Sequence, residues 1–349
     1  MSDVPPTTPP LFVEPITDPA AWDGLVDSLG GHPLQLWGWG QTKAAGAWTA
    51  HRLRIASGDR TVGVAQVLVR RLPFPFRALS YVPRGPVVAS ADPDAPVGYG
   101  VGDEATRTAV ASAVVTWCRE HVGGVGVSFE PDWPAGTTLP LAGVRTGGQR
   151  ILYPSTLVLD LSTTPDELVA AMGRSTRADI RNGGRDVEIR RVTAEGEVRA
   201  VLDVYRETAV RAEFDLHSDE YYLTLHRELG DASVLVAAFR DGSPCAFVWD
   251  VNSATTAFEL YGGVDDTGRK ARANAPVKWH AVQIAQEAGL LRYDMNGLLN
   301  DGISAFKRSF AKHEDELVGT LDVAFSALYP VWVRAVPLAK RLLRAVRRR

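Results

Sequence analysis

The residues best suited to chemistry lie in one short segment near the end of the chain, residues 293–310 (YDMNGLLNDGISAFKRSF). The start of this segment predicts a strand followed by a turn. Asp301 is a suitable N-cap for a short helix that carries Phe306 and Lys307. A cation held where a strand turns into a helix can bind an anionic group. A solvent-exposed lysine on an amphipathic helix would give the same pattern.

The elements that must position this segment follow one order in both halves of the chain. Each half predicts helices, three successive strands, another helix and a final strand. The first half predicts a helix at 18–29, strands at 49–55, 62–69 and 78–82, a helix at 104–120 and a strand at 126–129. The second half predicts a strand at 157–161, helices at about 164–183, at 198–214 and from 218 or 219, strands at 234–239, 245–251 and 256–262, a helix at 273–288 and a strand at 291–294.

This repetition predicts an α+β fold of two tandem acetyltransferase-like (GNAT-like) domains, each built on a mixed sheet. The first domain is predicted to span residues 1–155. Residues 320–349, where a strand precedes a basic helix, are expected to complete it. The second domain is predicted to span residues 156–319, with the boundary near Tyr153 and Pro154.

Composition and charge are those of a globular protein, with 45% hydrophobic and 23% charged residues among 349. The first ten residues lack the features of a signal peptide, no run is long and apolar enough for a membrane span, and two cysteines give no disulfide framework. We therefore expect a cytoplasmic protein. Residues 330–349 carry seven basic and no acidic side chains beside an apolar face, which predicts a peripheral contact with the inner face of the membrane.

Several reaction classes lack their motifs in this sequence. It contains no G-x-x-x-x-G-K-[ST] loop for ATP and no G-x-G-x-x-G between a strand and a helix. The seven histidines show no spacing typical of a metal site, so we expect no metal and no bound cofactor. The [QR]-x-x-G-x-[GA] loop with which acetyltransferases hold coenzyme A is missing, and residues 268–275 (GRKARANA) stand in its place. The acyl group would then arrive on another carrier.

Several separate motifs together resemble the FemABX family of aminoacyl-tRNA-dependent peptidyltransferases, and in particular its FemX-like members. The resemblance extends over about residues 35–310. It is carried by QLWGWGQTK (35–43) with GAW (46–48), YVPRGP (81–86), Leu161 through Arg177 and Arg181 to Val187, Tyr205 to Arg211 with Phe214 and Tyr221-Tyr222, YGG (261–263), YDMNG (293–297), and Phe306-Lys307 with Phe310. No single motif is decisive; their common order makes the resemblance specific.

The resemblance implies transfer of an amino acid from aminoacyl-tRNA to the side-chain amine of the third stem residue of a peptidoglycan precursor. The acceptor would be lipid II or UDP-MurNAc-pentapeptide, and aminoacyl-tRNA would be a co-substrate, with no further cofactor. Some members carry a long coiled-coil arm in the second domain. The short distance from Leu161 to the next helices predicts that this arm is absent here.

The family motifs also assign roles by position. Lys43 and Arg211 match the residues expected to hold the diphosphate of the precursor. Tyr261 matches an aromatic residue of the acceptor groove. Phe306 and Lys307 match the pair at the transfer centre.

One position departs from the family pattern. The family often has Asp before Pro at the end of the last strand of the first domain, and Glu130 stands there in this sequence. A carboxylate is kept, so Glu130 is a candidate for substrate binding. Because the carboxylate lies one methylene further from the backbone, its role as a general base stays open.

The chemistry implied by the resemblance requires neither metal nor ATP, because an amine attacks an ester that is already activated. Holding the two reactants together can lower the barrier by about 7–11 kcal/mol. Lys307 would stabilise the oxyanion that forms at the ester carbonyl, or hold the 3′ end of the tRNA. Basic residues at 174–185 and 269–272 are candidates for tRNA phosphates, although a solvated helix face would show the same spacing.

Two other functions stay open at this point. The first is an N-acyltransferase of the same fold that uses another donor, such as acyl-coenzyme A; the missing glycine loop speaks against it. The second is a non-enzymatic protein that binds tRNA or a membrane, which only the basic C-terminal residues suggest. That function would leave Phe306 and Lys307 unexplained.

Overall fold

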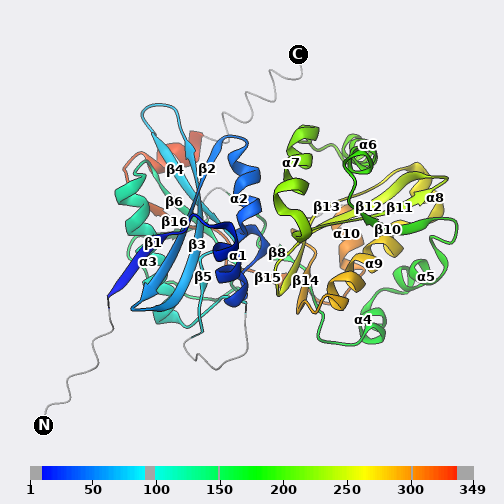
Figure 1. The fold of residues 1–349 in the computed structure, drawn as a ribbon, viewed down its shortest axis with the longest axis horizontal. Coiled ribbons are helices and arrows are strands. Elements are labelled where there is room, and N and C mark those ends of the chain that lie inside the picture. The colour runs from blue at the N-terminus through cyan, green and yellow to red at the C-terminus, as the bar shows by residue number, and fades with distance from the viewer. Residues whose placement is uncertain (1–9, 91–98, 148–149, 300–301, 336–349) are drawn as a thin grey trace, which may run out of the picture. The chain divides into compact units, whose positions relative to one another are not determined.

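The computed structural model describes residues 10–90, 99–147, 150–299 and 302–335. By their internal contacts the residues divide into two units, and Figure 1 shows the elements of each. Unit 1 comprises residues 1–29, 46–152 and 318–349, and unit 2 comprises residues 30–45 and 153–317. Residues 30–45, which the sequence analysis placed in the first domain, therefore belong to unit 2. Asp301 and most of the basic C-terminal segment lie outside the described residues.

Unit 1 is built on a sheet with the strand order β1-β2-β3-β4-β6-β16-β7, in which β5 also pairs with β3. Of the strand pairs that the structure describes in this sheet, β4 and β6 pair in parallel and the others pair antiparallel, so the sheet is mixed as expected. The strands are β1 (Leu11–Pro15), β2 (Trp48–Ser57), β3 (Arg60–Arg71), β4 (Ala78–Pro83), β5 (Val87–Val88), β6 (Gly126–Glu130), β7 (Val144–Thr146) and β16 (Leu321–Ala324). Its helices include α1 (Pro19–Ser28) and α3 (Glu104–His121), and residues 329–335 are also helical.

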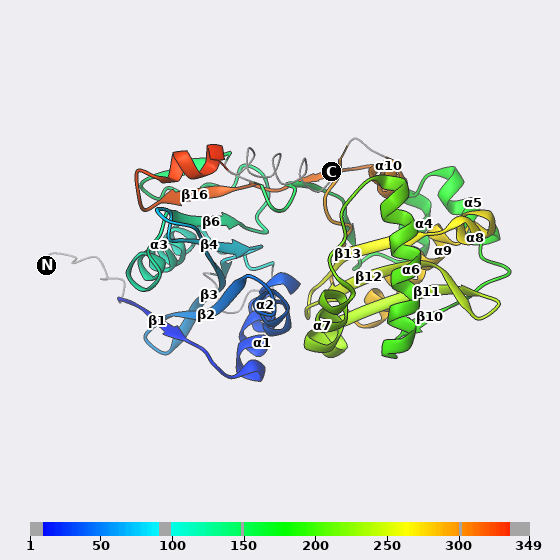
Figure 2. The same ribbon diagram turned by 90° about the horizontal axis from the view of Figure 1, so that it is seen from above.

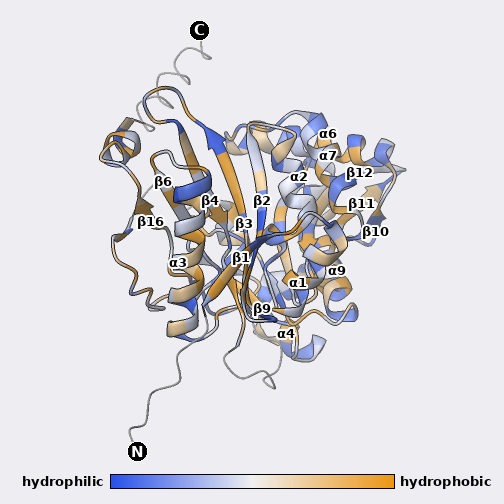
Figure 3. Ribbon diagram, turned by 60° about the vertical axis from the view of Figure 1, so that its left-hand side comes forward, coloured by the Kyte–Doolittle hydropathy of each residue, from blue (hydrophilic) through white to orange (hydrophobic). Residues whose placement is uncertain are grey.

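The helices of unit 1 begin where the sequence predicts. Asp18 and Asp103 each accept a hydrogen bond from a backbone N–H three residues on, at 2.7 and 2.9 Å, and so cap α1 and α3. The strand β3 consists largely of small and branched apolar residues, whose colour is visible along the sheet in Figure 3. Val64, Val67 and Leu68 are buried there, and this burial holds the sheet together.

Unit 2 is built on a second mixed sheet with the order β10-β11-β12-β13-β14-β9. Its strands are β9 (Val158–Asp160), β10 (Glu188–Val192), β11 (Ser233–Arg240), β12 (Ser243–Asn252), β13 (Thr256–Val264) and β14 (Arg292–Asp294), and β8 (Ser155–Thr156) pairs with β15 (Asp315–Glu316) apart from this sheet. Its helices are α2 (Trp37–Ala44), α4 (Pro165–Ala171), α5 (Arg174–Asn182), α6 (Glu195–Ala212), α7 (Asp219–Leu229), α8 (Asp266–Ala271), α9 (Asn274–Glu287) and α10 (Gly302–Arg308), with 3₁₀ turns at Pro33–Gln35 and Gly230–Ala232.

The helices α6 and α9 pack on opposite faces of this sheet, as Figures 1 and 2 show. On the α6 side, Tyr205 lies edge-on to Phe247 with ring centroids 5.4 Å apart. On the α9 side, Val277, Ala281 and Val282 are buried. Two layers of helix therefore enclose the strands that line the candidate site.

The sequence analysis expected one helix at about 164–183, and the structure contains two. Thr164 and Glu167 form a capping box at the start of α4. The helix ends at Met172, whose extended ψ of 157° breaks the hydrogen-bond ladder. Arg177 of α5 donates to the carbonyls of Ala170 and Met172, at 3.2 and 2.7 Å, and so satisfies carbonyls freed by the break.

No described helix is both long and apolar enough to cross a membrane. The longest helices in the described part of the chain, α3 and α6, have 18 residues each. The coiled-coil arm found in some FemABX members is therefore missing from unit 2 as far as the structure describes it, in agreement with the sequence analysis.

Candidate active site

The candidate site is a pocket of about 350 Å³ in unit 2. The strand β13 pairs with β14 at residues 256–258. Beyond the end of β14, residues 259–264 of β13 line the pocket. The other sides come from α6, α8, α9 and α10. The lining side chains with a charge or an aromatic ring are Tyr205, Arg211, Phe214, Phe247, Glu259, Tyr261, Arg269, Lys278, Phe306 and Lys307.

Arg211 and Tyr261 lie on the α6 side of this pocket. The Arg211 guanidinium donates to the carbonyl of Val264 at 2.7 Å, which fixes it beside the end of β13. Tyr261 packs against Tyr205 and Tyr222, with ring centroids 5.6 and 5.2 Å apart. Burial, followed by the neighbouring Tyr221 hydroxyl, raises the pKa of Tyr261 well above its usual value. Tyr261 therefore presents a neutral phenol to the pocket.

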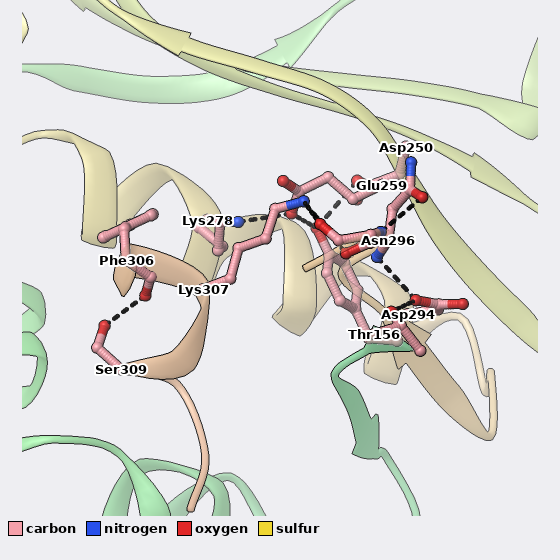
Figure 4. Close-up of polar contacts among 11 residues, drawn as sticks. Thr156, Asp250, Glu259, Lys278, Asp294, Asn296, Phe306, Lys307 and Ser309 are labelled. Carbon is pink, nitrogen blue, oxygen red and sulfur yellow. Dashed lines mark hydrogen bonds and ion pairs between the residues drawn. The ribbon is translucent and has the colours of Figure 1, made fainter. Parts of the chain in front are cut away.

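Phe306 and Lys307 enter the pocket from α10. Figure 4 shows Lys307 directed at the turn that follows β14. Its Nζ donates to the carbonyls of Asn296 and Gly297, at 3.2 and 3.4 Å. The side chain is only 9% exposed, so Lys307 holds its positive charge in a partly desolvated place, where electrostatic effects are stronger than in water.

Asp294 shapes the turn that holds Lys307. The carboxylate accepts hydrogen bonds from the hydroxyl of Thr156 and from the N–H of Asn296, the latter at 2.7 Å. Asn296 takes a left-handed conformation with φ of 59°, which asparagine tolerates better than most residues. The turn predicted at this place from the sequence is confirmed, and it exposes two carbonyls to Lys307.

Lys43 is outside the set of residues that line the pocket, but it belongs to the same unit. It lies on α2, which packs on α7 so closely that a Cβ on Gly38 would come within 2.2 Å of the Glu228 carbonyl oxygen. Its Nζ donates to the Tyr221 hydroxyl at 2.7 Å and lies 4.2 Å from the ring centroid of Trp39. Tyr221 in turn hydrogen-bonds to Tyr261, and this contact connects Lys43 to the pocket.

Glu130 lies in unit 1 and is engaged by unit 1 itself. Its Oε1 accepts hydrogen bonds from the N–H of Ile151 and the hydroxyl of Thr320, at 2.8 and 3.0 Å. Its Oε2 accepts from the Tyr81 hydroxyl and the N–H of Leu152, at 2.6 and 2.9 Å. The side chain is 2% exposed. With two donors on each oxygen, Glu130 is placed to join β6 to the chain that leaves unit 1 at residue 152 and returns at residue 318.

The sequence analysis missed a buried polar cluster on the α9 side of the pocket. Lys278 Nζ donates to Glu259 Oε2 at 2.6 Å, and the two side chains are only 3% and 7% exposed. The Tyr293 hydroxyl donates to Asp250 Oδ1 at 2.9 Å and approaches Glu259 Oε2 at 3.4 Å. Figure 4 shows this cluster beside Lys307.

The charges of this cluster follow from its burial. Burial, followed by the nearby Glu259 carboxylate, raises the pKa of Asp250 well above its usual value. This shift favours the protonated form of Asp250, and Lys278 forms an ion pair with Glu259. The Lys278 Nζ also lies 5.2 Å from the Phe306 ring centroid, so a cation–π contact ties the cluster to the expected transfer centre.

Contacts within unit 2 hold residues 265–275, which include the segment that stands in place of the coenzyme A loop. Asp265 caps α8 by accepting a hydrogen bond from the N–H of Gly268 at 2.7 Å. A Cβ on Gly268 would lie 2.2 Å from the carbonyl oxygen of Cys245, so this glycine is required for packing. Asp266 forms an ion pair with Arg269 of the same segment.

The sequence and the fold are similar to those of known proteins. Residues 171–308 match the model of the acetyltransferase (GNAT) domain. No curated protein sequence gives a significant match. Among solved structures, FemX superposes with a TM-score of 0.77 over 90% of this chain and 97% of FemX, at 17% identity. A tandem GNAT protein from the clavulanic acid biosynthesis pathway gives a TM-score of 0.51 over 91% of this chain and 99% of its own, at 12% identity.

These similarities confirm the predicted α+β fold of two tandem GNAT-like domains with mixed sheets. The fold as a whole is FemX-like. The GNAT domain match includes all the residues that line the pocket, from Tyr205 to Lys307, and it supports a role in acyl transfer.

Proposed function

We propose that this protein is an aminoacyltransferase that moves an amino acid from aminoacyl-tRNA to the side-chain amine of the third stem residue of a peptidoglycan precursor. Lipid II and UDP-MurNAc-pentapeptide are the candidate acceptors. The observation that carries the proposal is the single pocket that joins Arg211, Tyr261, Phe306 and Lys307, to which the FemABX motifs assign acceptor binding and transfer. The FemX-like fold over 90% of the chain supports it.

In the proposed reaction the amine lone pair forms a bond to the ester carbonyl carbon, and the bond from that carbon to the ribose oxygen breaks. The proton lost by nitrogen ends on the ribose oxygen. The carbonyl oxygen becomes negative before the ester bond breaks, and Lys307, held by two carbonyls of a rigid turn, supplies positive charge in the pocket. Arg211 and Arg269 line the same pocket, and they would bind phosphate groups of the substrates.

Incubation with a mixture of charged tRNAs and lipid II, followed by mass spectrometry of the product, tests this function. The added mass identifies the amino acid and the number transferred. In the Lys307→Ala variant we expect transfer to fall by about 10²–10³, because one group that stabilises the oxyanion is removed, while the affinity for the acceptor stays near that of the wild type. Wild-type turnover in this variant would remove Lys307 from the mechanism.

The GNAT domain match also favours a second candidate, an N-acyltransferase that uses acyl-coenzyme A. The Asp265 cap opposes it, because the N–H of Gly268 is already occupied. A thermal-shift titration separates the two: a rise in melting temperature with acyl-coenzyme A, and none with an aminoacylated tRNA 3′-end analogue, would favour the second candidate.

A further inference from the structure

We propose that Glu259 binds the amino group of the acceptor, and that this contact selects acceptors that carry a side-chain amine. The inference deepens the proposed function and rests on it in taking an amine as the nucleophile. It does not depend on the identity of the acyl donor.

The geometry of the Glu259 carboxylate supports this role. Lys278 and Tyr293 hold Oε2, at 2.6 and 3.4 Å, so the group is fixed in position. Oε1 accepts no hydrogen bond from any residue that the structure describes. It is directed at the part of β13 that lines the pocket, since a Cβ built on Gly262 would lie 3.7 Å from it. One oxygen is therefore anchored and the other is presented to a ligand.

A β-bulge aims this side chain. Trp249 pairs with Tyr261 and Asp250 with Glu259, so Leu260 is inserted without a partner. In a regular strand Glu259 and Tyr261 would point to the same face. Here Tyr261 packs with Tyr205 on the α6 side, whereas Glu259 pairs with Lys278 on the α9 side. The bulge thus allows one strand to present an aromatic ring and a carboxylate to the same pocket.

The charges around the pocket leave one place for a cation. Among the described residues that line it, Glu259 is the only acid, and Arg211, Arg269, Lys278 and Lys307 are basic. Anionic parts of the substrates will therefore be drawn to the basic residues, and an ammonium group to Glu259 Oε1.

Binding of two acceptor analogues tests the inference without any tRNA. UDP-MurNAc-pentapeptides with lysine and with diaminopimelate at the third position are titrated calorimetrically, and the tighter ligand is compared with an analogue in which a methyl group replaces its side-chain amine. The wild type should bind the amine at least about tenfold more tightly, as expected for a hydrogen bond to a charged group. In Glu259→Gln the amide oxygen should turn to Lys278 and its NH₂ to the pocket, so the preference should be lost.

Two further variants control this experiment. Asp250→Asn changes a buried neighbour that does not line the pocket, and it should keep the preference. Glu259→Gln with Lys278→Met removes both charges and provides a folded comparison should the single variant unfold. Equal binding of both ligands by the wild type, binding of neither, or a preference that survives in Glu259→Gln would refute the inference. A retained preference without transfer from tRNA would refute only the proposed donor.

Discussion

Replacement of Glu130 by Gln distinguishes a structural carboxylate from one that acts on substrate. Each oxygen of Glu130 accepts one backbone N–H and one hydroxyl. In Glu130→Gln the NH₂ group must face one of these pairs. The hydroxyl of Thr320 or Tyr81 can rotate and accept a hydrogen bond, but the N–H of Ile151 or Leu152 cannot. One backbone N–H that faces the buried side chain of residue 130 is therefore left without an acceptor.

The expected loss of stability follows from the hydrogen bonds that are lost or weakened in Glu130→Gln. An unsatisfied buried donor costs about 1–3 kcal/mol, and the remaining hydrogen bonds lose the charge that makes such bonds about twice as strong as neutral ones. We expect Glu130→Gln to lower the free energy of unfolding of unit 1 by about 3–4 kcal/mol. Tyr81→Phe is the matched control, because it removes one donor and leaves the carboxylate in place, at a cost of about 1–2 kcal/mol.

Urea denaturation followed by tryptophan fluorescence measures both variants, and the transfer assay is run at a temperature where they remain folded. We expect the folded Glu130→Gln protein to retain transfer activity. The opposite result, wild-type stability with transfer abolished, would show that Glu130 acts on the substrate and that its hydrogen bonds in unit 1 do not define its role.

Four other variants give separate readouts. Arg211→Ala and Lys43→Ala should each weaken acceptor binding in calorimetry by about tenfold, the loss expected for a charged hydrogen bond; unchanged affinity would refute the diphosphate assignment. In Asp250→Asn, stability should rise relative to the wild type as the pH increases above about 4, because the raised pKa of Asp250 keeps it protonated in the folded state while it ionises on unfolding; parallel stability curves would contradict this. Removal of residues 330–349 should reduce sedimentation with anionic vesicles, and equal binding would exclude the membrane contact.

The order of helices and strands could be predicted from the sequence because most of these elements have a clear period and clear ends. The strands β3 and β12 consist of apolar residues at strand length, and Asp18 and Asp103 mark helix starts. The helix α2 was not predicted, because its WGWG start has weak helix propensity. It is stabilised instead by close packing on α7, which the sequence cannot show.

The candidate site could be predicted only in part, because some of its contacts also depend on packing that the sequence cannot show. Family motifs pointed to Arg211, Tyr261, Phe306 and Lys307, and the structure brings these four around one pocket. Glu259 and Lys278 lie in no quoted motif, and their contact depends on a bulge that has no sequence signature. The available signal was a charge among apolar residues in each of two elements, Glu259 in β13 and Lys278 near the start of α9, since buried charges are almost always paired.

The two residues of the expected transfer centre are held by different parts of unit 2, and this has a consequence for mutagenesis. Lys307 is held by the turn after β14, which Asp294 shapes. Phe306 lies against Lys278 and so adjoins the Glu259 cluster. Loss of the Phe306 ring therefore removes a cation–π partner from a buried lysine, which is worth about 0.5–2 kcal/mol, and should disturb Glu259 before it disturbs Lys307. A defect in Phe306→Leu that appears in acceptor affinity, with turnover retained at saturation, would fit this division of the pocket; a defect in turnover alone would place the ring with Lys307 at the reacting ester.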